Sequence, residues 1–232
     1  MRLLPENAQI SGMIHFKDRD LLTLGKEEMR RIRGHEISMI FEQPSSCLNP
    51  VFTVGDQIAE AVRANEECEK KEARESAIAL MKLTGIPSPE KRFGQYPHEF
   101  SGGMLQRAMI SIAMASKPAL LIADEPTTSL DVSVQAQMIE LIKDLIAKFD
   151  MSLLLITHDL GVAAELCRDV VVMYAGEIVE NGCLNEVFDH PRHPYTQALL
   201  KAISDGELRP IRGTVPELTH LPEGCRFHPR CP

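Results

Sequence analysis

The chain has 232 residues, of which 44% are hydrophobic, and this is enough to bury one sizeable core or a domain with a subdomain. Its formal net charge of -8 provides no positive field for a polyanion, so nucleic acid is excluded as an expected partner. No apolar stretch reaches the length of a signal-peptide core or a membrane span, and the six cysteines are mostly dispersed. We therefore expect a cytosolic protein in a reducing compartment.

Three continuous apolar runs predict buried strands, because a strand covered on both faces carries hydrophobic residues at successive positions. They lie at 119–123, 153–156 and 170–174. Between the first two, apolar residues recur at helical spacing over 134–145. Strand, helix and strand in this order indicate a parallel α/β sheet. Two further extended segments are expected at 12–16 and 36–41.

The segment 53–86 has a helical pattern with one apolar side, and Pro87 and Pro89 then end it. It predicts a helical insert in the α/β core. Beyond Val179, short helices are expected near 184–188 and 195–202, before a tail rich in proline and glycine.

Two adjacent carboxylates, Asp124 and Glu125, directly follow the predicted strand at 119–123. The carboxyl ends of parallel strands are where α/β sheets bind ligands. One interpretation is a phosphate site in which Asp124 holds Mg²⁺ and Glu125 orients and deprotonates the attacking water. The other is a turn with two solvated acids, and the dipeptide alone does not decide between them.

Two more residues follow the same pattern. His158 comes directly after the strand at 153–156, so it is either a γ-phosphate contact at the same edge or a packed or capping histidine. Asp131 precedes the predicted helix, where it caps the helix, contributes to a ligand site, or does both.

The segment Ser101-Gly102-Gly103 opens a long helical run. Exposed backbone N–H groups at a helix N-terminus form an anion site. The alternative is an ordinary serine cap followed by a glycine turn.

Taken together, the segments F-S-G-G-M-x-Q-R, LLIADEPTTSLD and LLLITHD in this order resemble the ATP-binding-cassette ATPases over essentially the whole chain. The resemblance implies a P-loop NTPase-like (RecA-like) parallel sheet with a helical subdomain. It also assigns roles to residues: Ser101, Gly102 and Gly103 match the signature motif, Asp124 and Glu125 the Walker B acids, Asp131 the D-loop and His158 the switch histidine.

The subfamily is indicated by four segments that resemble the ATPase subunits of dipeptide, oligopeptide and nickel importers. They are Met39–Ile58, Tyr96–Met104, His193–Ile203 and Gly224–Pro232. The resemblance implies ATP hydrolysis with Mg²⁺, and a second ATPase subunit whose signature motif completes each nucleotide site. It further implies transmembrane permease subunits, an indirect partnership with a periplasmic or extracellular solute-binding protein, and a peripheral location on the cytoplasmic face of a bacterial or archaeal plasma membrane.

Two positions depart from the family pattern. The family has its loop glutamine directly after I-F, whereas this chain reads Ile40-Phe41-Glu42-Gln43-Pro44, so either Glu42 or Gln43 is the expected metal-binding residue. The signature segment carries Leu105 where these importers generally have arginine, which leaves the Ser-Gly-Gly anion site intact.

The printed sequence contains no G-x-x-x-x-G-K-[ST] motif, and residues 1–5 resemble the end of the helix that follows such a P-loop. We therefore expect an N-terminally truncated copy: a gene fragment, an internal start or a shortened expression product. Such a chain alone would be inactive, and a non-catalytic partner that lends its signature motif and D-loop to an intact subunit is the alternative function. We also expect the missing P-loop strand to leave residues 119–123 as an unpaired edge.

Cys225 and Cys231 match the first half of a four-cysteine pattern that holds an iron–sulfur cluster in some of these importers. Two thiolates cannot hold a cubane cluster alone, so the alternative is a pair of unligated cysteines.

The resemblance divides the chain into four expected parts. They are the remnant of the N-terminal core (1–44), the helical subdomain with the signature motif (45–115), the RecA-like core (116–190) and the C-terminal importer-type extension (191–232).

Overall fold

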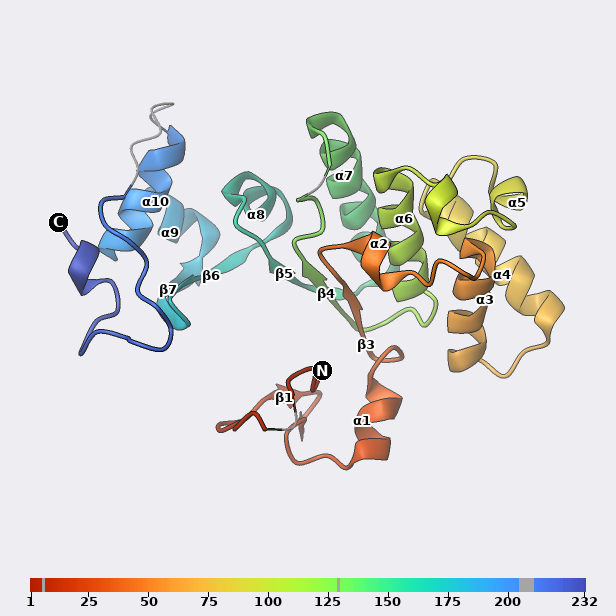
Figure 1. Cartoon of the computed structure of the whole chain (residues 1–232), viewed down its shortest axis with the longest axis horizontal. Coiled ribbons are helices and arrows are strands. Elements are labelled where there is room, and N and C mark those ends of the chain that lie inside the picture. The colour runs from red at the N-terminus through yellow and green to blue at the C-terminus, as the bar shows by residue number, and fades with distance from the viewer. Residues whose placement is uncertain (6, 129, 205–210) are drawn as a thin grey trace. The chain divides into compact units, whose positions relative to one another are not determined.

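A computed structural model of the chain describes residues 1–5, 7–128, 130–204 and 211–232 (Figure 1). The chain divides into two units, Met1–His158 (unit 1) and Asp159–Pro232 (unit 2), and each is described by itself. The four-part division expected from the sequence stays a prediction. Among the described helices, none combines the length and the apolar character that a membrane crossing requires.

Unit 1 is built on a three-stranded sheet in the order β3-β4-β5. The strands are β3 (Ile37–Ile40), β4 (Leu120–Asp124) and β5 (Ser152–Ile156). Both pairings are parallel. Leu121 and Ala123 of the central strand are completely buried. The predicted parallel α/β sheet is thus confirmed, with strand bounds within one residue of those expected for β4 and β5.

Helix α7 (Val132–Phe149) connects β4 to β5. Its apolar positions recur at helical spacing, and Met138, Ile142 and Leu145 are buried. The helix ends at Asp150, which has a left-handed backbone with φ of 50°. The predicted strand, helix and strand unit therefore forms as expected.

The remaining helices of this part of unit 1 precede β4. They are α2 (Pro44–Cys47), α3 (Val54–Asn65), α4 (Lys70–Leu83), α5 (Pro89–Arg92), the 3-10 helix η1 (Pro97–Glu99) and α6 (Gly102–Ala113). Ile58, Ala77, Met81 and Ala108 from three of these helices share one core cluster with no solvent exposure. The helical pattern over 53–86 thus forms α3 and α4, which bury their apolar sides against α6.

The N-terminal part of unit 1 contains the short antiparallel pair β1 (His15–Phe16) and β2 (Arg19–Asp20), followed by α1 (Lys26–Ile32). The helix end expected at residues 1–5 is absent, and that prediction was wrong. Leu3 and Leu4 are exposed, so no packing surface stabilises a helical turn there.

Unit 2 contains an antiparallel hairpin of β6 (Asp169–Tyr174) and β7 (Glu177–Cys183). Its two-residue turn places Ala175 and Gly176 at φ of 47° and 83°, as a type I′ turn requires. The run at 170–174 is therefore a strand, but the expectation that both its faces are covered is wrong for the described residues. Val171 and Met173 alternate with buried positions and are exposed.

The helical elements among the described residues of unit 2 are α8 (Leu160–Leu166), α9 (Leu184–Asp189), α10 (Pro194–Ser204) and the 3-10 helix η2 (His228–Arg230). Phe227 is almost fully buried, with its ring centroid 5.1 Å from Tyr174 and 5.5 Å from Tyr195. Arg226 pairs with Glu177 at 2.9 Å and donates to the Ala175 carbonyl. The C-terminal residues are thus fastened to the β6–β7 hairpin.

The position of the sheet edges corrects one expectation. β4 was expected to be an unpaired edge, yet it pairs with β3 on one side and β5 on the other. Within the part of unit 1 that the structure describes, β5 has a strand on one side only, and Leu154 and Ile156 are 51% and 47% exposed. The edge with exposed apolar side chains is therefore β5, and such an edge is a template for pairing with another chain.

We predict that Leu154→Lys lowers self-association, because a charge on an edge strand opposes pairing with a second chain. The measurement is the apparent mass by size-exclusion chromatography with light scattering, across a concentration series. Val132→Lys is the control, since Val132 is 84% exposed but lies on α7 rather than on a strand. Equal effects of the two substitutions would contradict the role of the β5 edge.

Candidate functional site

The carboxyl ends of three strands meet at one edge of the sheet in unit 1. Their register places Ile40 opposite Ala123, and Asp124 opposite Ile156. The residues that follow these strands are Glu42 and Gln43 after β3, Glu125 after β4 and His158 after β5. The structure thus brings the predicted acidic residues and the predicted histidine to the same edge.

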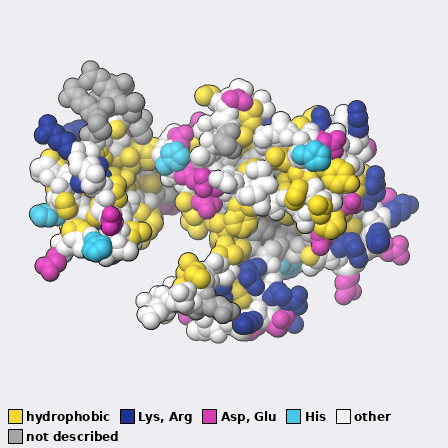
Figure 2. Space-filling view, in the orientation of Figure 1, with side chains coloured by type: hydrophobic (Ala, Val, Ile, Leu, Met, Phe, Trp, Pro, Cys, Tyr) yellow, Lys and Arg dark blue, Asp and Glu magenta, His cyan; other side chains and the backbone are white. Residues whose placement is uncertain are grey.

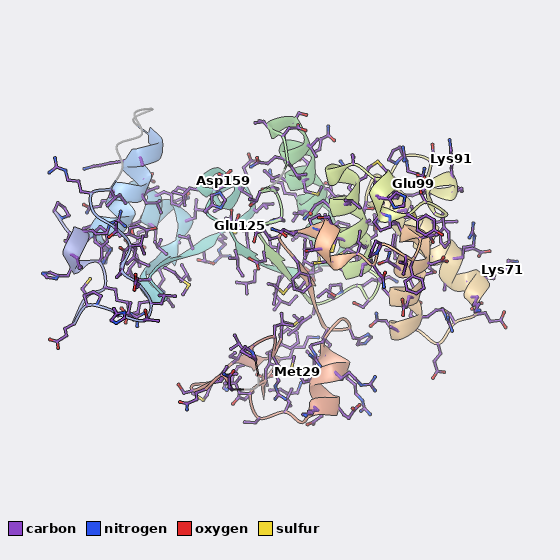
Figure 3. The ribbon with its side chains drawn as sticks, in the orientation of Figure 1. Met29, Lys71, Lys91, Glu99, Glu125 and Asp159 are labelled. Atoms are coloured by element: carbon purple, nitrogen blue, oxygen red, sulfur yellow. The ribbon has the colours of Figure 1, made fainter. Side chains whose placement is uncertain are left out.

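Glu125 is held by hydrogen bonds from two directions. Its Oε1 accepts the backbone N–H of His158 at 3.0 Å and lies 2.7 Å from the Nδ1 of the same residue. Its Oε2 accepts the hydroxyl of Thr128 at 2.7 Å. Figure 3 labels Glu125 in the central part of the view, at the end of β4. Both oxygens of the carboxylate are therefore fixed by neighbouring groups.

The backbone of Glu125 is in the left-handed region, with φ of 47°, which is uncommon for a residue other than glycine. Its N–H donates to the Ile156 carbonyl at 2.9 Å, so it continues the ladder between β4 and β5 before the chain turns. Residues in sparsely populated backbone regions cluster at functional sites because the surrounding structure must hold them. Here the hydrogen bonds to His158 and Thr128 supply that constraint.

Burial of the Glu125 side chain, which is 19% exposed, acts to raise the pKa of its carboxyl group. The hydrogen bonds from Thr128 and His158 act in the opposite direction and prevail, so this pKa lies below its ordinary value. The carboxylate is consequently ionised at neutral pH and can only accept hydrogen bonds, which places a proton on Nδ1 of His158.

Thr128 is a residue of this site that the sequence reasoning missed. It lies three residues after Glu125, and its backbone N–H also donates to the Glu125 carbonyl at 3.4 Å. The signal in the sequence was a hydroxyl residue in the turn that follows the acidic pair, a position from which side chains reach back to the preceding residues. Its neighbour Ser129, in the same predicted segment, lies outside the described residues.

The expected metal ligands are placed as follows. Asp124 is the last residue of β4 and is half-buried, while Glu42 and Gln43 are exposed beyond the end of β3. Gln43 is the residue that precedes α2. All three offer the hard oxygen donors that Mg²⁺ prefers, and all lie at the edge where Glu125 lies. Whether Glu42 or Gln43 is the second ligand stays a prediction.

Ser101 is the N-cap of α6, and its Oγ accepts the backbone N–H of Met104 at 3.4 Å. Gly102 and Gly103 form the first turn of the helix, where backbone N–H groups have no partner within the helix. The capping interpretation is therefore seen in the structure, and the anion site stays a prediction. Leu105, where arginine was expected, is buried with Phe100 and Ala108 in the helical core.

Asp131 is the N-cap of α7. Its Oδ1 accepts the backbone N–H groups of Ser133 at 3.1 Å and Val134 at 3.0 Å, and the hydroxyl of Ser133 at 2.8 Å. The hydrogen bond from Val134 is the main reason that the pKa of Asp131 lies below its ordinary value. The capping role is thus seen, and a role toward a ligand stays a prediction.

Cys225 and Cys231 are both exposed thiols in unit 2. Across the residues that the structure describes, no group of three or more histidine, cysteine or acidic side chains gathers as a metal site. An iron–sulfur role for the two cysteines is thus a prediction without support from these contacts.

Comparisons with known proteins identify the family of the chain. A family model described as "ABC transporter" matches residues 1–128, and one described as "Oligopeptide/dipeptide transporter, C-terminal region" matches residues 179–232. The chain is 50% identical over 228 residues to the oligopeptide transport ATP-binding protein AppD of Bacillus subtilis (strain 168), which covers 96% of this chain and 70% of AppD. It is 49% identical over 236 residues to the dipeptide transport ATP-binding protein DppD of the same organism, covering 99% and 70%.

Among solved structures, the dimeric post-hydrolysis state of the ATP-binding cassette MJ0796, bound to ADP and Pi, has a TM-score of 0.68 with this chain. The match covers 75% of this chain and 74% of that chain at 24% sequence identity. At this identity the similarity supports the fold alone.

We predict that Thr128→Val raises the pKa of Glu125, because it removes one of the hydrogen bonds that stabilise the ionised carboxylate. A carboxylate with a lowered pKa contributes stability above its unfolded-state pKa, and this is lost as the pH falls through the folded-state pKa. In the variant the loss therefore begins at the same unfolded-state pKa, but it is smaller and is complete at a higher pH. The free energy of unfolding at pH 7 falls by about 1 kcal/mol.

The measurement is the pH titration of the Glu125 carboxyl carbon by NMR, together with melting temperatures across the acidic range. Thr128→Ser is the matched control, since it keeps the hydroxyl and should keep the low pKa. An unchanged titration of Glu125 in Thr128→Val would show that the hydroxyl does not hold the carboxylate.

Proposed function

Since this chain belongs to the ABC transporter family of ATPases, we propose that it is an ATP-binding subunit of an importer that energises the uptake of peptides, with nickel chelates as a second substrate class. The observation that carries the ATPase role is the Glu125 carboxylate held by His158 at the carboxyl ends of parallel strands. The peptide class rests on the C-terminal region matched over 179–232 and on the names of AppD and DppD.

The chemistry follows from the side chains at this edge. Glu125 is ionised and accepts protons, so it suits the orientation and deprotonation of a water molecule that attacks the γ-phosphate. The imidazole of His158 is oriented by its Nδ1 contact with Glu125. Asp124, with Glu42 or Gln43, would hold Mg²⁺, which neutralises phosphate charge when it is bound with ATP.

A second candidate function is favoured by two residues of the matched motifs. Ser101 of the signature segment and Asp131 of the D-loop are both present as helix caps. In ABC dimers these two elements act on the nucleotide bound to the other subunit. The chain would then complete a nucleotide site on an intact homologous subunit without hydrolysing ATP at its own.

The proposed partners are a second ATPase subunit and the membrane subunits of the importer, with the chain bound peripherally at the cytoplasmic face. An exposed apolar surface on unit 1 supports a protein partner. It consists of Val51 and Phe52, which precede α3, and of Tyr96, which follows α5. The Val54 N–H donates to the Gln95 carbonyl, and this hydrogen bond joins the two segments. Figure 2 shows hydrophobic side chains gathered in this part of unit 1.

We predict that the 232-residue chain alone binds ATP weakly. The backbone amides and lysine of a P-loop supply the positive groups that cradle the phosphates, and Asp124, Glu125 and His158 offer more negative than positive charge to a polyanion. Titration with labelled ATP and Mg²⁺ should detect no micromolar site. One-to-one binding with a micromolar dissociation constant would contradict this expectation.

We further predict that the chain raises the ATP turnover of an intact relative, such as DppD, when the two are mixed. Two single substitutions in this chain then separate the candidate functions. Ser101→Arg blocks the anion site offered to the relative's nucleotide, whereas Glu125→Gln removes only the base of the chain's own site.

The effects of these two substitutions on the gain in ATP turnover distinguish the two candidate functions. If the chain lends its signature motif, Ser101→Arg abolishes the gain in turnover and Glu125→Gln leaves it in place. If the chain also hydrolyses ATP, Glu125→Gln lowers the gain as well. The absence of any gain with the unmodified chain, at every mixing ratio, would exclude the second candidate function.

A further inference from the structure

The two glycines of the signature segment have different surroundings. A Cβ added to Gly102 would meet no atom within 4 Å, whereas a Cβ added to Gly103 would lie 2.8 Å from Cγ1 of Val134 on α7. Neither glycine has a positive φ, so the backbone conformation does not require glycine at either position. The space beside Gly103 is therefore taken by α7, and the first turns of α6 and α7 touch at this point.

A second contact joins the same helices about one turn further along each. The Nη2 of Arg107 on α6 donates to Oε1 of Gln137 on α7 at 3.1 Å, while its Nη1 donates to the Thr84 carbonyl at 2.7 Å. Thr84 is the C-cap of α4, where unpaired carbonyls favour a cation. The contacts of Gly103 with Val134 and of Arg107 with Gln137 thus join the N-terminal halves of α6 and α7.

The residue that Gly103 contacts is directly linked to the D-loop. The N–H of Val134 donates to Asp131 Oδ1 at 3.0 Å, and Val134 is β-branched, so its side chain has little freedom to move aside. A group that displaces Val134 therefore also disturbs the cap that holds Asp131.

We propose that Gly103 is a positioning residue. Its lack of a side chain lets the first turn of α6 pack directly against Val134, and this seating holds Ser101 and Asp131 in fixed positions on one surface. Arg107 holds the two helices in the same register one turn away. The use of that surface toward a second subunit rests on the proposed function. The seating itself is a property of this chain and is tested without ATP or a partner.

The experiment compares alanine substitutions at the two glycines. Alanine is the better helix former, so Gly102→Ala should leave the melting temperature unchanged or raise it. Gly103→Ala should lower it by roughly 3 to 8 °C, because a methyl group would overlap with Val134. In a Val134→Ala background, where Cγ1 is gone, Gly103→Ala should no longer lower it.

Two local measurements distinguish positioning from a general loss of stability. In Gly103→Ala, hydrogen exchange of the Ser133 and Val134 amides should accelerate at least tenfold relative to the β4 amides, and the pKa of Asp131 should rise toward its ordinary value. Both changes should reverse in Gly103→Ala with Val134→Ala. The proposal is overturned if Gly103→Ala behaves as Gly102→Ala does, or if Val134→Ala brings no recovery. A failure of the mixing experiment above would refute the lending of the signature motif and leave this result unaffected.

Discussion

The register of the β3-β4-β5 sheet is the constraint on which the rest of unit 1 depends. β4 is buried and paired on both sides, so a shift by one residue would turn its apolar side chains out of the core. That register sets Asp124 opposite Ile156 and so brings Glu125 within reach of His158 on the next strand. The geometry of the site is therefore a consequence of core packing in the sheet.

The left-handed backbone of Glu125 links the packing of the sheet to the chemistry of the site. The strand must end there, because Pro126 follows and is buried, and the carboxylate must face the end of β5. Two opposing effects act on its pKa: burial favours the neutral acid, and hydrogen bonds favour the ion. The bonds prevail, which yields a carboxylate that is shielded from much of the solvent yet remains ionised.

Much of this site was predictable because its signals are local in sequence. The apolar runs at 119–123 and 153–156 are each followed directly by a polar residue, and the carboxyl ends of parallel strands share an edge, so Glu125 and His158 were expected to be neighbours. The order of the strands was not predictable in this way, since it depends on contacts between distant segments, and β4 was wrongly expected to be an edge. Thr128 was missed because a single hydroxyl in a turn has many possible partners.

The two helix caps near the predicted signature motif and D-loop hold their side chains with different strength. The Ser101 hydroxyl accepts one long bond of 3.4 Å, whereas Asp131 accepts two backbone N–H groups and a hydroxyl within 3.1 Å. A hydroxyl bound so weakly can turn toward a phosphate oxygen at small cost, while the carboxylate of Asp131 is fixed in place. Ser101 thus suits direct anion contact, and Asp131 suits the rigid part of an interface. The seating of Gly103 on Val134 would join the two.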